Sequence, residues 1–131
     1  EVDGDINRGM DRVMSDLLKL CKKFDVWVGV VSHLRKTGIG SISYEEGADV
    51  TEDSLKGSGS LKQIAFQIIA FSRNKYAETE DERNQVKISV LKNRFTGRTG
   101  YAGSAKYDEN TGRLINVKAR ADEFIIEERI V

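Results

Sequence analysis

The sequence predicts an α/β fold with helices packed on a mixed β-sheet, and three observations support this. Apolar residues recur every three or four positions in residues 5–24, the period of a helix with one buried face. Residues 26–31 form an unbroken apolar run, typical of a strand covered on both faces in a parallel sheet. Residues 86–90 place an apolar side chain at every second position, as a half-buried strand does. The length of 131 residues suits one domain.

The predicted helix comes first in the chain. Its apolar stripe includes the only cysteine, Cys21, whose position on this stripe favours a small core residue over a reactive thiol. A single cysteine cannot form an internal disulfide, so a reducing cytoplasm is the expected location. The other members of the stripe are Ile6, Met10, Val13, Met14, Leu17, Leu18 and Phe24.

Residues 34–60 lack sustained periodicity and predict a long loop containing five glycines. A loop of this length in a compact domain is usually functional. Next come a predicted short helix at residues 61–67 and a strand at 68–71.

The second half of the chain predicts three more strands. After a polar connection at residues 72–84, the alternating strand runs from 86 to 91 and leads into residues 92–94. Strands at 101–107 and 113–117 follow glycine-containing turns. The tail after residue 117 is ambiguous between helix and strand.

The charge balance excludes some function classes and leaves others open. The chain has 21 basic and 21 acidic residues, but residues 53–106 hold ten basic against five acidic ones. This segment could meet phosphates, or it could be a basic surface offset elsewhere. The longest apolar run is far shorter than the roughly 20 residues that span a bilayer, so no membrane partner is expected.

Candidate functional residues lie at predicted strand ends and in glycine loops, where open α/β sheets place ligands. His33 follows the apolar strand, and a structural role for it is weighed equally with a functional one. Residues 56–63 combine glycines with lysines, which suits phosphate or a flexible turn. Lys92 and Arg94 share one strand face, as a solvated pair or as a phosphate-binding fork.

The sequence contains no complete nucleotide-binding or catalytic motif. It has no GxxxxGK[ST] phosphate loop, no GxGxxG, no HExxH and no zinc-like Cys/His cluster. No metal ligands are therefore assigned.

Five short motifs nevertheless occur in a characteristic order. They are VVSHL at residues 30–34, GSGSLKQ at 57–63, IIAFSRN at 68–74, LKNRFTGRTG at 91–100, and Tyr107. In this order they resemble the C-terminal part of the RecA-like motor of hexameric replicative DNA helicases. The resemblance is nearest to bacteriophage primase-helicases of the DnaB-type superfamily and covers residues 10–114. It implies that residues 1–117 are part of a motor domain whose N-terminal phosphate-loop half is missing. Residues 118–131 would be a tail of unknown role.

The resemblance implies roles for individual residues. His33 would sense the γ-phosphate with Gln63 beside it, Arg94 would be an arginine finger with Lys92 next to it, and Arg73 and Tyr107 would flank the adenine. The candidates for contacts with single-stranded DNA are Arg35, Lys36, Lys56, Gly57, Ser58 and Gly59.

The implied function is that of an ATP-driven helicase that moves along single-stranded DNA and unwinds duplex. The intact protein, of which this chain would be a part, would use ATP and Mg²⁺. It would form a homo-oligomeric ring with nucleotide at its subunit interfaces. The cytoplasm of a bacterial or phage-infected cell is the expected location, and the chain alone is expected to be inactive. A recombinase-like or single-stranded-DNA-binding module without unwinding is the alternative, and a regulatory or interface piece is a third.

Two departures from the family pattern limit this transfer. Lys56 stands where relatives commonly carry Arg, which weakens a bidentate role at that position. Ala65-Phe66 replaces a more polar stretch, so the helix predicted at residues 61–67, which contains it, is expected to pack differently.

Overall fold

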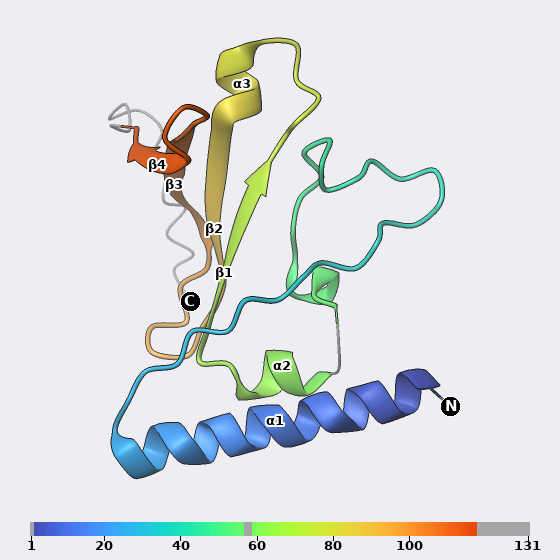
Figure 1. The fold of residues 1–131 in the computed structure, drawn as a ribbon, viewed down its shortest axis with the longest axis vertical. Helices are drawn as coiled ribbons and strands as arrows, with labels where there is room; N and C mark the ends of the chain where they lie inside the picture. Colours follow the sequence, from blue (N-terminus) through green and yellow to red (C-terminus); the bar gives the residue numbers. More distant parts are fainter. Residues whose placement is uncertain (1, 57–58, 118–131) are drawn as a thin grey trace.

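The computed structural model describes residues 2–56 and 59–117, which form three α-helices, one short 3₁₀ helix and a four-stranded sheet (Figure 1). Helix α1 (Val2–Phe24) and helix α2 (Gly59–Ile64) lie side by side at one end, and helix α3 (Glu80–Asn84) lies at the other. The 3₁₀ helix η1 (Glu52–Ser54) belongs to the long loop. The helix predicted at residues 5–24 and the irregular loop after residue 34 are thus confirmed, while the helix predicted at 61–67 begins and ends earlier.

The described sheet is entirely antiparallel, in the order β1-β2-β3-β4. Its strands are β1 (Gln67–Arg73), β2 (Gln85–Asn93), β3 (Gly100–Asp108) and β4 (Arg113–Asn116), which confirms the four strands predicted after the loop. The register shifts between Ile68 and Ile69 and again between Ile88 and Ser89. Such irregularities increase local twist and redirect the side chains beyond them.

The core has two small parts. Met14 on α1 and Leu61 on α2 are buried where the two helices meet. In the sheet the buried apolar residues are Ile68, Ala70, Val86 and Ala105. The α1 stripe is only partly covered, because Ile6, Val13 and Phe24 are more than half exposed.

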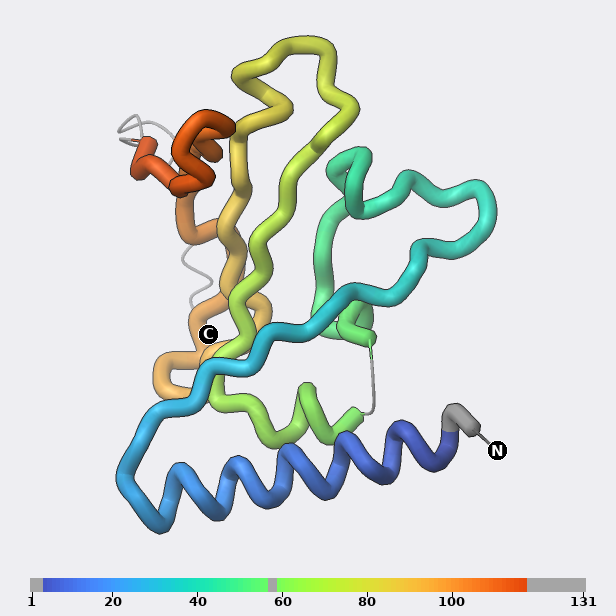
Figure 2. Tube along the Cα trace, in the orientation of Figure 1, coloured from blue at the N-terminus to red at the C-terminus, as the bar shows by residue number. Residues whose placement is uncertain are grey.

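The strand predicted at residues 26–31 is absent, and that prediction is wrong for this structure. The segment runs from α1 back across the molecule (Figure 2) and forms no sheet ladder. Trp27 is 76% exposed and Val31 is 95% exposed. An apolar run becomes a central strand only when neighbouring strands supply backbone partners, and the described residues supply none to this segment.

The acidic run at residues 78–82 is partly helical, where the sequence predicted only a polar connection. Thr79 caps α3, since its hydroxyl accepts a hydrogen bond from the backbone N–H of Glu82 at 3.3 Å. The acidic residues in the first turn also stabilise α3, because their negative charges interact favourably with the positive end of the helix dipole. Thr79 is the signal that identifies this helix.

Candidate nucleotide and DNA interface

Three of the predicted catalytic residues meet at the C-terminal end of α2. The Lys92 ammonium donates a hydrogen bond to the backbone carbonyl of Lys62, and the Arg94 guanidinium donates one to the backbone carbonyl of Gln63. Lys92 and Arg94 therefore lie on the same side, as their spacing predicted. The last carbonyls of a helix lack partners within the helix and attract cations, which accounts for this arrangement.

Arg94 is held by its backbone while its side chain remains exposed. Its N–H donates to the carbonyl of Phe66 at 2.9 Å, and its guanidinium carbon lies 5.4 Å from the centre of the Phe66 ring. Phe66 in turn stacks on Phe95, with ring centres 5.8 Å apart. Phe66 therefore contacts both the Arg94 guanidinium and the Phe95 ring.

His33 and Lys56 lie together where the two ends of the long loop meet. The Lys56 N–H donates to the His33 carbonyl at 2.9 Å, and Leu34 pairs with Leu55 in an isolated antiparallel bridge. Arg35 reinforces this closure, since its N–H donates to Ser54 and its Nε to Leu55, each at 2.8 Å. The side chains of His33, Arg35 and Lys56 are all exposed to solvent.

The rest of the predicted DNA-binding set is placed only in part. Lys36 follows Arg35 on the outgoing side of the loop and is exposed, and Gly59 begins α2. Gly57 and Ser58 lie outside the described residues, as does the tail from 118 to 131.

Arg73 and Tyr107, predicted to flank adenine, contact each other directly. The Arg73 guanidinium carbon lies 4.7 Å from the centre of the Tyr107 ring. Arg73 also donates to the side-chain oxygen of the buried Asn84 at 2.9 Å and lies 3.7 Å from the Glu109 carboxylate. A base between them would need about 3.5–4.0 Å on each side, so a sandwich requires the pair to separate.

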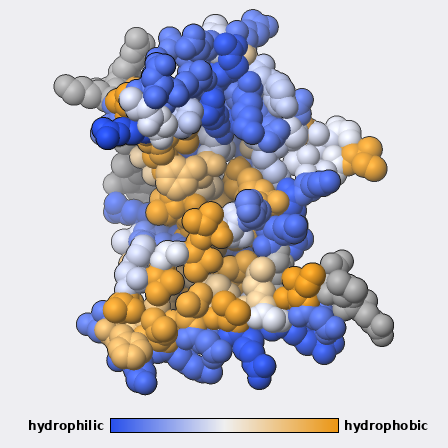
Figure 3. All heavy atoms as spheres, in the orientation of Figure 1, coloured by the Kyte–Doolittle hydropathy of each residue, from blue (hydrophilic) through white to orange (hydrophobic). Residues whose placement is uncertain are grey.

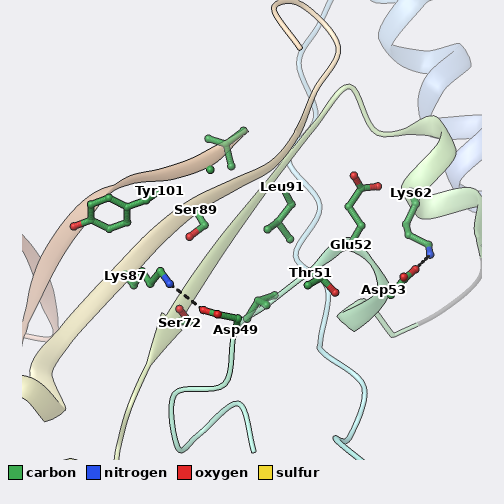
Figure 4. A pocket seen from close by; sticks show the side chains of 13 residues that line it. Asp49, Thr51, Glu52, Asp53, Lys62, Ser72, Lys87, Ser89, Leu91 and Tyr101 are labelled. Carbon is green, nitrogen blue, oxygen red and sulfur yellow. Dashed lines mark hydrogen bonds and ion pairs between the residues drawn. The ribbon is translucent and has the colours of Figure 1, made fainter. Parts of the chain in front are cut away.

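The return side of the long loop lies over the sheet, with a hollow of about 620 Å³ between them (Figure 4). Lys87 of β2 pairs with Asp49 at 3.0 Å, and Lys62 of α2 pairs with Asp53 at 2.5 Å. The Lys62 ammonium lowers the pKa of the Asp53 carboxyl below its ordinary value. Asp49, which lies upstream of residues 53–106, thus offsets part of the basic surplus counted in that segment.

Sequence reasoning missed this pairing, although a signal was present. Glu45, Asp49 and Asp53 recur at intervals of four in a loop that is otherwise irregular.

The described residues offer no group of three or more His, Cys, Asp or Glu side chains able to hold a metal ion. None of the helices in the described ranges is both long and apolar enough to cross a membrane.

Comparisons with known proteins agree with the ordered motifs. No family model matches the chain. The DNA helicase/primase of Enterobacteria phage T3 is 38% identical over 112 residues, which are 86% of this chain and 19% of that protein. Among solved structures, the ATPase domain of G40P has a TM-score of 0.68 at 25% identity, covering 86% of this chain and 38% of that one. The chain spans about a fifth of the length of the phage relative. It is therefore similar over most of its length to a phage DNA helicase/primase and has a partial RecA-like fold, as the motifs predicted.

Proposed function

We propose that this chain is part of an ATP-driven replicative DNA helicase that moves along single-stranded DNA and unwinds duplex. The observation that carries the proposal is the 38% identity to the phage helicase/primase over 86% of the chain. The gathering of Gln63, Lys92 and Arg94 at the end of α2 supports it. In the full-length protein the subunits form a ring in the cytoplasm of a bacterial or phage-infected cell and use ATP with Mg²⁺.

Arg94 acts as an arginine finger on ATP held by a neighbouring subunit, with Lys92 beside it. Both cations are bonded to neutral carbonyl oxygens, and a phosphate oxygen is a stronger acceptor because the hydrogen bond is then charge-assisted. Arg94 is exposed, so it can exchange one acceptor for the other without unfolding its surroundings. Gln63, whose carbonyl holds Arg94, lies beside the same phosphate.

His33 couples the nucleotide to the DNA. Its carbonyl is bonded to Lys56, so a movement of the His33 backbone reaches the base of the loop directly. Arg73 and Tyr107 hold the adenine after they separate. The DNA phosphates are contacted by Arg35, Lys36 and Lys56, and by the backbone of Gly57, Ser58 and Gly59.

Residues 1–117 belong to the motor, and residues 118–131 are a C-terminal tail of unknown role. Because the chain contains no GxxxxGK[ST] motif, its phosphate-loop lysine comes from another part of the protein. The 131-residue chain by itself has no ATPase activity, since that lysine and the metal ligand do much of the positioning in phosphoryl transfer.

The deciding experiment is strand separation by the full-length protein on a forked duplex. Displacement with ATP, and none with a non-hydrolysable analogue, is the expected result. Binding of single-stranded DNA without displacement under both conditions would favour the alternative, a recombinase-like or DNA-binding module.

A further inference from the structure

The long loop has two sides of opposite charge. Its outgoing side carries Arg35 and Lys36, whereas its return arm, residues 45–55, carries acids at every fourth position. Each of these three acids pairs with a lysine from the body of the domain. The pairs are Glu45 with Lys75 at 2.9 Å, Asp49 with Lys87 at 3.0 Å and Asp53 with Lys62 at 2.5 Å.

Among the described residues, backbone contacts to the rest of the domain hold the return arm only near its two ends. At one end Glu46 pairs with Asn74, and the Lys75 N–H donates to the Glu45 carbonyl at 2.8 Å. At the other end Leu55 pairs with Leu34. The span between these ends lies across the hollow of about 620 Å³, where the Asp49 and Asp53 pairs connect it to β2 and α2 (Figure 4).

The last of these pairs also connects to the candidate DNA-binding residues. The Asp53 carboxyl feels the charge of Arg35 as well as that of Lys62, and both lower its pKa. Asp53 lies three residues before Lys56, which is bonded to His33. Breaking the Asp53–Lys62 ion pair is therefore expected to shift the backbone at the base of the loop, where Lys56 is bonded to His33.

We propose that Glu45, Asp49 and Asp53 form an electrostatic fastening that fixes the return arm on the domain and so orients the basic outgoing side of the loop. Salt can weaken this fastening reversibly, because all three carboxylates are exposed and exposed ion pairs are screened by salt. The consequence for DNA rests on the proposed function, whereas the fastening itself does not. These acids are positioning residues, and they touch no DNA.

The test is amide hydrogen exchange in the full-length protein, which needs neither DNA nor ATP. A single exposed ion pair changes an equilibrium by up to about fivefold, so the triple variant E45Q/D49N/D53N should exchange on the order of tenfold faster across residues 45–56. The variant E52Q is the matched control, because Glu52 lies in the same arm and should leave exchange unchanged. Exchange in the triple variant equal to that of the wild type would overturn the proposal.

Two further measurements separate the fastening from a folding defect. Reversing one pair with D49K/K87D should restore exchange that D49K alone accelerates, and failure to restore it contradicts the pairing. In the wild type, raising salt from about 0.1 M to about 1 M shortens the Debye length from about 10 Å to about 3 Å, so the arm should loosen while β2 and β3 stay protected. An arm insensitive to salt would contradict the fastening.

Binding of single-stranded DNA then tests the consequence. The triple variant gains three units of positive charge, which by itself would strengthen DNA binding. We expect its affinity to fall about threefold or more instead, because the basic side is no longer oriented. A rise in affinity would show that the acids shield the lysines and would overturn the orienting role. If the wild type binds no DNA, the proposed function fails while the exchange result still decides the fastening.

Discussion

His33 has an exposed side chain, and its carbonyl is bonded to Lys56 across the base of the loop. We propose that His33 senses the γ-phosphate, and its bond to the base of the loop then predicts a coupling role. In the full-length protein, His33→Ala should reduce DNA stimulation of ATP hydrolysis about tenfold or more and change nucleotide affinity less than threefold. Steady-state hydrolysis with and without DNA measures this, and equal losses in the two rates would indicate a folding role.

Asp108 stabilises the turn between β3 and β4 through its charged form. The hydroxyl of Thr111 donates to its carboxylate at 2.8 Å and the N–H of Asn110 at 2.9 Å, and these bonds lower the Asp108 pKa below its ordinary 3.8. A lowered folded pKa means that this stabilisation is complete above about pH 4 and is lost as the pH falls through the folded value. Thr111→Val should move the pKa back toward 3.8 in a carboxyl NMR titration, and Thr99→Val should not. An unchanged Asp108 pKa in Thr111→Val would contradict the assignment.

At the scale of elements, α3 is connected to the sheet through Asn84, which is only 3% exposed. Its side-chain oxygen accepts from Arg73, whose guanidinium also packs on Tyr107. Asn84→Ala removes the acceptor of one Arg73 terminal nitrogen, while Arg73 Nε keeps the Arg83 carbonyl, and should lower the local stability of β1 and β3 by about 1 kcal/mol. Native-state hydrogen exchange of the full-length protein checks this, with the exposed Asn110→Ala as control. Equal stability in the two variants would exclude this role.

Local patterns predicted most elements because their causes are local. Apolar spacing identifies α1, alternation identifies β2, and glycine turns separate β2, β3 and β4. The prediction failed at residues 26–31, where the outcome depends on strand partners that no local pattern specifies. It also missed the three ion pairs of the return arm, because they join residues up to 38 positions apart. Most site residues required the family resemblance, and their roles remain predictions.

At the scale of the whole molecule, apolar side chains gather over the sheet and α1 on one face (Figure 3). Among the described residues, Trp27, Val31 and Phe71 are each more than half exposed. Monomeric soluble proteins rarely expose large continuous apolar patches, so exposed side chains of this kind favour association of the isolated chain.

The isolated 131-residue chain should therefore self-associate. Phe71→Ser should raise the dimer dissociation constant about tenfold, since burying a phenylalanine contributes about 1.5–3 kcal/mol. Sedimentation equilibrium measures this, with Tyr76→Ser as control, because Tyr76 is 69% exposed in the connection between β1 and α3. A chain that stays monomeric at high concentration would contradict this prediction.

Subunit mixing decides whether Arg94 acts on ATP held by a neighbouring subunit, as we propose. Arg94→Ala subunits of the full-length protein are mixed with subunits that lack the phosphate-loop lysine, and DNA-stimulated hydrolysis is measured. Each parent should be reduced on the order of 10³-fold or more, and Arg94→Lys should also be severely impaired because an ammonium lacks the planar fork. Mixed rings should recover part of the activity, since some sites then combine an intact lysine with an intact Arg94. Mixed rings that demonstrably form and hydrolyse no faster than either parent would contradict the account.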